Sequence, residues 1–398
     1  MRKQLVALVG LLALPLQAAP PAYTPDLQAR VFDRAWSLVN KHYWDRSRTG
    51  ESWADARDHF RPLAIAAQGR PAFYTVLGEM LASLGDSHVY AIDPVQIAIG
   101  KARDAGRSEQ GFGLSMLPND DGRWLVTRVN PGSAAAQAGV QIGWEVKSVN
   151  GKPVDIDYQP HEGDRATFDF ADEHGTYHAL ALTAAPEAAR PVRRATRLPG
   201  DILLVGLDGF DPGADRWLAR QMADGPPLRG VILDLRGNDG GDADVIAKVA
   251  GLFFAEDRPL VRRIERRENV QKVRGTGARA YLGPLAVLVG PDSASGAEAI
   301  AALVDESGRG TTVGERTAGA LTGAAEFPLP DGGELSVAEF DIRTPDGRRL
   351  EGVGLQPQIA VKASLADLRA GRDPVLDRAL VALRNGQLAA GRHLGIGG

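Results

Sequence analysis

The chain has 398 residues, of which 44% are hydrophobic and 24% are charged, and its net charge at pH 7 is -4. This length exceeds one ordinary domain, so we expect two or three modules that each bury a core. The composition is typical of a soluble globular protein, and the weak negative charge argues against nucleic acid as a partner. The absence of cysteine excludes disulfide scaffolds, thiolate metal sites and cysteine nucleophiles, so covalent chemistry would need an oxygen or lysine nucleophile.

The first residues have the pattern of an export signal. Arg2 and Lys3 precede an apolar run from 5 to 16, and Ala18 and Ala19 supply small residues for cleavage. The run is short for a membrane-spanning helix, and no later segment is apolar for long enough. The sequence therefore predicts a periplasmic or secreted protein with no stable membrane span after signal removal. A retained signal anchor is the competing interpretation, whereas a lipoprotein anchor would need a cysteine.

Helical spacing of apolar residues predicts a helical region from Pro25 to Leu84. Gly85 is typical of a helix C-terminus, and the sequence DSHVY, residues 86–90, follows it. One histidine after a helix indicates little by itself, so His88 is so far a structural or surface residue.

The middle of the chain changes to short strands. Residues 111–116 and 124–129 have strand patterns, and 131–139 is typical of a short helix that ends at a glycine. The Asn150-Gly151 pair lies between two alternating runs, which predicts a β-hairpin. Residues 184–200 are rich in alanine, proline and arginine, and we expect them to form a linker or an exposed connection. The two histidines four apart in this region, His174 and His178, are expected at the surface, because that spacing does not place ligands side by side on a strand.

The last half of the chain alternates strand and helix patterns, which predicts an α/β domain with a partly parallel sheet. Asp234 and Arg236 at the end of one strand are expected to form a structural pair. The glycine-rich loop 237–241 is not a phosphate-binding P-loop, because no Gly-Lys-Ser/Thr follows it. Its glycines would instead let main-chain amides approach a reacting group. The expected strands are 202–207, 230–235 and 285–289, and the expected helices are 217–222, 244–254 and the segment that begins at Gly296.

Ser295 lies between the strand 285–289 and the helix that begins at Gly296. The unpaired amides at a helix N-terminus carry partial positive charge and can hold an oxyanion, which is where a nucleophilic serine is useful. The alternative is that Ser293 and Ser295 simply cap the helix.

Two segments of the strand-rich region resemble a PDZ domain: GFGLSM at 111–116, and PGSAAAQAGVQIGWEVKSVNGKPV at 131–154. The resemblance implies a loop whose amides take the terminal carboxylate of an extended chain end, bound by strand addition. The alternative is a PDZ-like fold that only braces or covers the neighbouring domain. The residues of this loop are Gly111, Phe112, Gly113 and Leu114.

Three motifs, DSHVY, DLRGNDGG and DSASGAE followed by VGERTAG, resemble in this order the C-terminal processing peptidases and the related tricorn core proteases. In that family the PDZ module also lies between the helical region and the catalytic domain. Many members use a serine with a lysine base. Here Ser295 has the serine position, but the lysine position after Gly319 is Ala320, and Lys362 lies outside the motif. The Ser/Lys mechanism is therefore not supported.

The tricorn-like branch uses a serine, a histidine and a glutamate. Its Ser-His pair matches Ser87 and His88, and its glutamate matches Glu351 in the similar segment RLEGVGLQP. The resemblance implies that Ser295 is the nucleophile, His88 the general base, and Glu351 the carboxylate that orients it, either directly or through Ser87. The alternative for Glu351 is a solvated loop residue. The implied oxyanion donors are the amide of Gly296 and one from Gly240 or Gly241.

Together these features predict a multi-domain α/β protein, an exported serine endopeptidase of the tail-specific peptidase and crotonase-like type. Its partners would be protein or peptide substrates, and its chemistry requires no metal or cofactor. The competing hypothesis is an inactive protein of the same fold that binds peptides or apolar ligands, since the lysine is missing and some relatives of this fold bind retinoids. Substrate preference and homo-oligomer formation stay open. The expected divisions are a signal peptide at 1–19, a helical region at 20–100, a PDZ-like domain at 101–185 and a peptidase domain at 186–398.

Overall fold

A computed structural model describes residues 23–104, 109–119, 121–154, 163–187, 192–265 and 267–393. The expected helical region is confirmed. Its first helix begins where the Thr24 hydroxyl accepts a hydrogen bond from the Leu27 amide, an N-cap. Apolar side chains at helical spacing are buried between the helices. The helices of this unit are α1 (Pro25–His42), α2 (Glu51–Ala66), α3 (Gly69–Ala82) and α4 (Pro94–Asp104).

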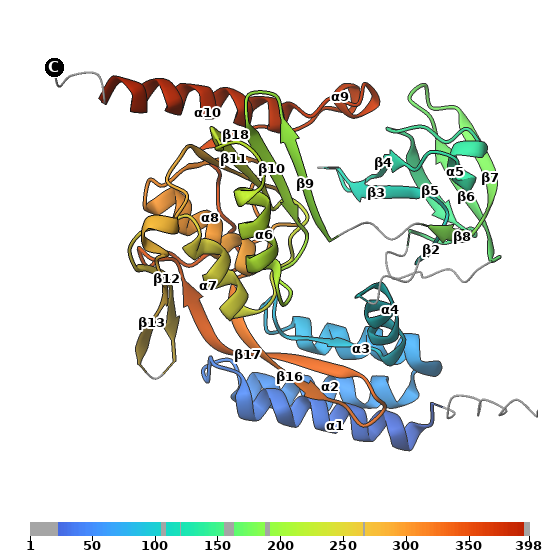
Figure 1. Cartoon of the computed structure of the whole chain (residues 1–398). Coiled ribbons are helices and arrows are strands. Elements are labelled where there is room, and N and C mark those ends of the chain that lie inside the picture. Colours follow the sequence, from blue (N-terminus) through green and yellow to red (C-terminus); the bar gives the residue numbers. More distant parts are fainter. Residues whose placement is uncertain are drawn as a thin grey trace, which may run out of the picture.

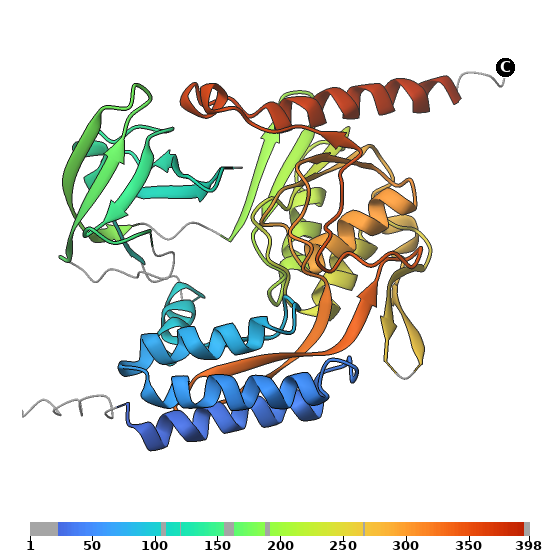
Figure 2. The same cartoon turned by 180° about the vertical axis from the view of Figure 1, so that it is seen from behind.

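A hairpin from the last third of the chain packs against these helices, as Figures 1 and 2 show. It consists of β16 (Thr322–Pro328) and β17 (Glu334–Arg343), and β1 (Tyr90–Ile92) pairs with β17 on the other side. Leu335 and Val337 of β17 belong to the same buried core as the helices. The helical region and the β16–β17 hairpin therefore share one core. The same sheet continues through β17 to β12 (Arg258–Ile264) and β13 (Glu268–Val273).

The strand-rich middle of the chain forms an antiparallel sheet of five strands in chain order, around a core that includes Phe168 and Phe170. The Asn150-Gly151 pair does form a tight turn, with φ of 53° and 72°. An antiparallel bridge between Val149 and Lys152 closes this turn, but residues 152–154, the last ones described before 163, form no second strand, and β5 pairs with β6. The elements are β3 (Leu114–Pro118), β4 (Trp124–Val129), α5 (Ala134–Gln137), β5 (Glu145–Val149), β6 (Arg165–Ala171) and β7 (Tyr177–Thr183), with β2 (Glu109–Gly111) paired to β8 (Ala185–Glu187).

The α/β unit is built on a six-stranded sheet with the order β18-β15-β14-β11-β10-β9. Alternate residues of the central strand β14 point to opposite faces, so Val287 packs under α6, α7 and α8 while Leu288 packs under α10. The first five strands are parallel, which confirms the expected sheet. The elements are β10 (Ile202–Leu207), α6 (Ala214–Ala223), β11 (Gly230–Asp234), α7 (Ala243–Gly251), η1 (Gly277–Arg279), β14 (Leu285–Val289), α8 (Gly296–Glu306), β15 (Thr311–Gly314), β18 (Ile359–Ala360), α9 (Leu365–Arg369) and α10 (Pro374–His393).

The expectation of a linker at 184–200 is wrong, because β8 lies there and β9 (Arg193–Leu198) forms the antiparallel edge of the α/β sheet. The arginines of β9 are paired: Arg193 binds Asp211, and Arg194 binds Asp208 at 2.6 Å. An edge strand exposes one side to solvent, so it accommodates charged residues that a central strand would not.

Arg236 holds the start of the C-terminal helix to the sheet. Its guanidinium donates to Asp234 at 2.8 and 2.9 Å and to Asp373, directly before α10, at 2.8 and 3.0 Å. The expected structural pair of Asp234 and Arg236 is confirmed. In the part of the chain described, no helix is both long and apolar enough to cross a membrane.

Gly314, the last residue of β15, tests how closely this strand packs against β14. Gly314 has φ of 134°, and a Cβ there would lie 2.0 Å from the Val289 carbonyl oxygen. We expect Gly314→Ala to lower the free energy of unfolding by at least about 2 kcal/mol, measured by urea titration. Gly308→Ala is the control, because its φ of 63° is also positive but no atom lies within 4 Å, so the loss should be about 1 kcal/mol. Equal losses would contradict the steric argument.

Candidate active site

Ser295 is the residue directly before α8, and its main chain is strained, with φ of 51° and ψ of -112°. Its amide donates to the Ala320 carbonyl oxygen at 2.8 Å, which holds this conformation. Its side chain makes no capping hydrogen bond to α8. The capping interpretation of Ser295 is therefore wrong, and its half-buried hydroxyl is not committed to the helix.

Ser293 has a structural role instead. Its hydroxyl is fully buried, donates to the Leu235 carbonyl oxygen at 2.7 Å and accepts from the Gly290 amide at 3.0 Å. These bonds fix the turn between β14 and α8.

The glycine-rich loop supplies an unpaired amide. Phe210 and Gly241 form an isolated parallel β-bridge. Its two hydrogen bonds run from the Phe210 amide to the Gly240 carbonyl at 2.7 Å and from the Asp242 amide to the Phe210 carbonyl at 3.0 Å. The Gly240 amide donates to Asn238 Oδ1 at 2.9 Å. The Gly241 amide points away from Phe210 and has no acceptor among the described residues. The sequence analysis gave Gly240 or Gly241 as the second candidate oxyanion donor, and of these two Gly241 has the amide without an acceptor among the described residues.

This loop packs directly against Ser295. A Cβ on Gly240 would lie 3.0 Å from Ser295 Oγ and 3.3 Å from the Gly296 nitrogen. The Gly296 amide is the first of α8 and, in the part of the chain described, has no acceptor either. Two free amides, from Gly241 and Gly296, therefore come from the two segments that flank the serine.

Ser87 connects His88 to Glu351. Its hydroxyl lies 2.8 Å from His88 Nδ1 and donates to Glu351 Oε2 at 3.0 Å. A hydroxyl has one proton, so a Ser87 that donates to the carboxylate must accept from His88 Nδ1-H. This network assigns the tautomer in which Nε2 carries no proton and can act as a base. The relay through Ser87 is the arrangement that the geometry adopts.

Glu351 is a buried carboxylate with only 5% exposure, so the alternative of a solvated loop glutamate is wrong. It accepts the Ser87 amide on Oε1 and the Leu321 amide on Oε2, both at 2.8 Å. These donors compensate the cost of burying its charge.

Burial lowers the pKa of His88 below its usual value of 6.5, because the imidazolium loses hydration, while the charges of Glu351 and Asp86 oppose this shift. His88 is therefore neutral at pH 7, as a general base requires.

The segment at the family's lysine position is held by a carboxylate that the sequence analysis missed. Glu298 is fully buried in the first turn of α8 and accepts from the Thr317 hydroxyl at 2.5 Å and from the amides of Gly319 at 2.9 Å and Ala320 at 2.8 Å. Burial raises its pKa, and these hydrogen bonds partly offset that shift. Its position in the DSASGAE motif, three residues after Ser295, was the available signal. Asp86, beside the Ser-His pair, was missed as well.

The four proposed peptide-binding residues lie together at the end of β2 and the start of β3, in the five-stranded module rather than beside Ser295. Phe112 belongs to the core of that module, and its carbonyl accepts the Ala135 amide at 3.0 Å. The ring of Phe112 therefore serves packing. His178 stacks on Trp144 at 4.5 Å and pairs with Asp172, whereas the side chain of His174 is exposed.

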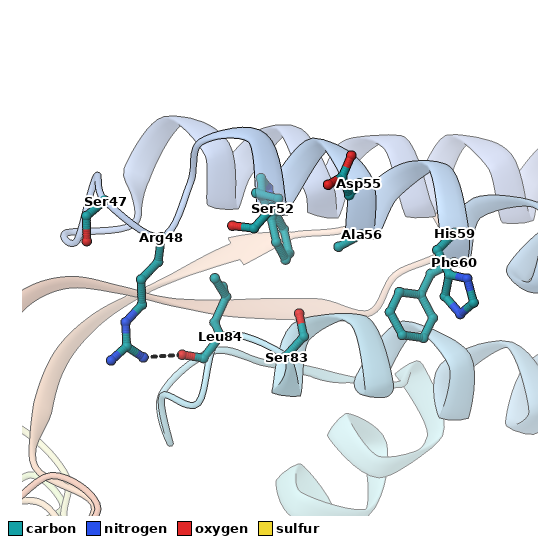
Figure 3. Close-up of a pocket in the computed structure, with 10 residues that line it drawn as sticks. Ser47, Arg48, Ser52, Asp55, Ala56, His59, Phe60, Ser83 and Leu84 are labelled. Atoms are coloured by element: carbon teal, nitrogen blue, oxygen red, sulfur yellow. Dashed lines mark hydrogen bonds between the residues drawn. The ribbon is translucent and has the colours of Figure 1, made fainter.

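A cavity of about 580 Å³ opens between α2 and the end of α3 (Figure 3). In it, Arg48 donates to the Leu84 carbonyl at 2.5 Å and supports the turn that leads to the Ser-His pair. None of the four candidate catalytic side chains lines this cavity. The cavity is lined by Ser47, Arg48, Ser52, Trp53, Asp55, Ala56, His59, Phe60, Ser83 and Leu84.

No group of three or more residues able to hold a metal ion occurs among the described residues.

Comparison with known proteins relates two segments of the chain to peptidases. Residues 201–361 match peptidase family S41, and residues 28–82 match the tricorn protease C1 domain. The chain is 26% identical to a carboxyl-terminal-processing protease from Synechocystis sp., over 92% of this chain and 89% of that protein. It is 27% identical to putative tricorn protease homolog 2 of Streptomyces coelicolor, over 88% of this chain but 32% of that protein.

Among solved structures, the fold resembles the photosystem II D1 C-terminal processing protease, with a TM-score of 0.59, 24% identity and coverage of 84% of this chain and 93% of that chain. It also resembles the tricorn protease, with a TM-score of 0.57, 18% identity and coverage of 91% of this chain and 37% of that chain. The family S41 segment contains Ser295, Glu351 and the glycine-rich loop, and the tricorn C1 segment ends shortly before Ser87. The chain therefore contains a domain of peptidase family S41 and a tricorn C1 segment, is similar to the C-terminal processing peptidases, and is a hydrolase of the serine peptidase type.

Proposed function

We propose that the chain is an endopeptidase that cleaves peptide bonds through an acyl-enzyme on Ser295. His88 is the general base, and Glu351 orients it through Ser87. The observation that carries this proposal is the hydrogen-bonded series from His88 through Ser87 to the buried carboxylate. The strained Ser295 between two unpaired amides supports it.

The chemical steps follow from these positions. Ser295 Oγ attacks the substrate carbonyl and gives its proton to His88 Nε2, and the imidazolium then gives that proton to the leaving amine. Water hydrolyses the acyl-enzyme with the same base. The negative charge on the carbonyl oxygen is held by the amides of Gly241 and Gly296, and the negative Glu351 stabilises the imidazolium through Ser87.

A lysine base does not fit this site. The residue at the family's lysine position is Ala320, and its amide is bonded to Glu298. Lys362 forms an ion pair with Glu315 at 3.8 Å. We therefore assign the base to His88.

The remaining parts of the proposal concern substrate delivery and location. The five-stranded module would bind substrate chain ends at Gly111–Leu114 in the manner of a PDZ domain, in keeping with relatives named for C-terminal processing. The chain would be exported to the periplasm or outside the cell by residues 1–19, which lie outside the described residues. The divisions at 20–100, 101–185 and 186–398 belong to this proposal.

The competing binding-only hypothesis is set aside, because the family assignment is to serine peptidases.

Replacing the nucleophile tests the proposal most directly. We expect Ser295→Ala to fold but to lose about a thousandfold or more of its peptide hydrolysis, and to lose labelling by a fluorophosphonate probe mapped to residue 295. Ser293→Ala is the matched control, because Ser293 is buried and structural. It should melt at a lower temperature yet still be labelled at Ser295. Unchanged hydrolysis by Ser295→Ala would remove the basis of the assignment.

The amide of Gly241 gives a second test. A Cβ there would lie 2.7 Å from the Phe210 carbonyl oxygen, and φ is 134°, so Gly241→Val must displace the main chain. Since loss of one oxyanion donor costs about a hundred- to thousandfold in rate, we expect kcat to fall by that amount. Steady-state kinetics and thermal melting should be measured together. A folded Gly241→Val protein with full kcat would contradict the role of this amide.

The ionisation of His88 predicts the pH dependence. The base must be unprotonated, so kcat/KM rises with pH through the pKa of His88. Burial depresses this pKa, so the half-maximal point should lie below pH 6.5 and the plateau should be reached at neutral pH. Glu351→Gln removes a charge that raises this pKa, so its acid limb should move to lower pH while the plateau falls about a hundredfold or more. An acid limb above pH 6.5 in the unaltered protein would be inconsistent with His88 as this base.

A further inference from the structure

The proposed mechanism assigns no role to Asp86, although this carboxylate is buried. It follows the positive-φ turn at Gly85, directly after α3, and precedes the Ser-His pair. Only 7% of it is exposed. Among the described residues it forms no ion pair, and the nearby Arg349 binds Asp341 instead, at 2.9 Å. The charge of Asp86 is therefore compensated by hydrogen bonds and, without a direct ion pair, by the nearby positive charge of Arg349.

Four donors from three parts of the chain supply these bonds. Oδ2 accepts from the Tyr43 hydroxyl and the Trp44 indole nitrogen, each at 3.2 Å. Oδ1 accepts from the His88 amide at 3.1 Å and the Thr322 hydroxyl at 3.2 Å. Asp86 therefore connects the end of α1, the main chain of His88 and the start of β16.

This pattern of donors selects aspartate over asparagine. The hydroxyls of Tyr43 and Thr322 can turn to accept a hydrogen bond, but the indole N-H of Trp44 and the amide N-H of His88 can only donate. These two fixed donors lie on different carboxylate oxygens. In either orientation, the NH₂ group of an asparagine would face one of them. The network thus requires a group that accepts on both sides, and the carboxylate adds a negative charge.

Asp86 also acts on the imidazole of His88. The charged groups of the described chain that act on His88 are Glu351, from the loop after β17, and Asp86, from the turn before His88 itself. Both favour the protonated ring against the effect of burial. The two carboxylates differ in their contacts, because Glu351 reaches the ring through Ser87 whereas Asp86 binds the main chain.

We propose that Asp86 is a positioning residue of this peptidase, which fixes the main chain of His88 relative to β16 and places a second negative charge beside the imidazolium formed during acyl transfer. The inference rests on the proposed role of His88 as the base. When Ser295 gives its proton to His88, the ring gains a positive charge, and Asp86 lowers the free energy of that state without touching the substrate.

The test removes the charge while keeping the hydrogen-bond partners Tyr43, His88 and Thr322. Trp44→Phe deletes one fixed donor, so in its background Asp86→Asn can keep its oxygen toward His88 and turn its NH₂ group toward the Tyr43 hydroxyl. The double variant is compared with Trp44→Phe, both in the full chain. The measurements are the pH titration of the His88 ring by ¹⁵N NMR of histidine-labelled protein, assigned with His88→Gln, and the pH profile of kcat/KM.

We expect the titration midpoint of His88 and the acid limb of kcat/KM to fall together by about one pH unit in the double variant. At neutral pH, kcat should fall about tenfold with little change in KM, since one pKa unit corresponds to a factor of ten in the stability of the imidazolium. If the midpoint and the acid limb match those of Trp44→Phe, the electrostatic role of Asp86 is refuted.

Asp331 provides a matched control in the same unit. It accepts from two tyrosine hydroxyls, Tyr23 at 3.0 Å and Tyr74 at 2.9 Å, and from the Gly333 amide at 3.1 Å. Asp331→Asn should lower the melting temperature but leave the His88 midpoint unchanged. A midpoint shift equal to that of the double variant would show a general effect of destabilisation and would overturn the inference.

Thr322→Val keeps the inference testable if the double variant does not fold. It deletes the contact between Asp86 and β16 without changing any charge. We expect kcat to fall about threefold or more, as for one lost hydrogen bond, with the His88 midpoint unchanged. An unchanged kcat would refute the positioning role. Because the NMR titration does not depend on hydrolysis, it also separates failure of this inference from failure of the Ser295 mechanism.

Discussion

The peptide group between Ala320 and Leu321 connects the two halves of the candidate site. Its carbonyl oxygen accepts the Ser295 amide, and its N-H donates to Glu351, both at 2.8 Å. A peptide group is planar and rigid, so this one unit fixes the main chain of Ser295, the proposed nucleophile, relative to Glu351, the carboxylate proposed to orient the base. Glu298 holds the same segment through the Ala320 amide. Residues 320 and 321 therefore serve as a spacer between Ser295 and Glu351.

The base reaches this spacer from the other end of the chain. His88 follows the N-terminal helices, and its carbonyl accepts from Ser336 of β17 at 2.9 Å, beside the β1–β17 pairing. The hairpin of β16 and β17 is itself part of the core of the helical unit. Packing of the helices on this hairpin therefore holds His88 at the edge of β17, on the same hairpin whose first residue, Thr322, follows the Ala320-Leu321 peptide. The position of His88 therefore depends on the packing of the helical unit against strands that lie more than two hundred positions later in the chain.

The periodic parts of the fold could be predicted from the sequence, because burial on one face leaves a repeating pattern in strands and helices. The arginine-rich strand β9 could not, since its charges are balanced by aspartates that only the folded chain brings near. The same limit applies to the site. Ser295 and His88 stand in recognisable motifs, but the burial of Glu298 and Asp86 depends on contacts with distant segments such as Thr317 and Thr322. A carboxylate in a polar stretch of sequence is predicted to lie at the surface, because the sequence does not show which residues surround it in the folded chain.

The surroundings of the site also bear on the choice of base. Buried carboxylates stabilise the protonated form of a neighbouring base. A lysine starts several pKa units above neutrality, so such neighbours would hold it charged and unable to accept a proton. A histidine starts near neutrality, and burial moves the pKa of His88 lower while Glu351 and Asp86 limit that shift. The balance leaves a ring that is neutral before the reaction yet stabilised once it is protonated. These surroundings favour a histidine over a lysine as the proposed base.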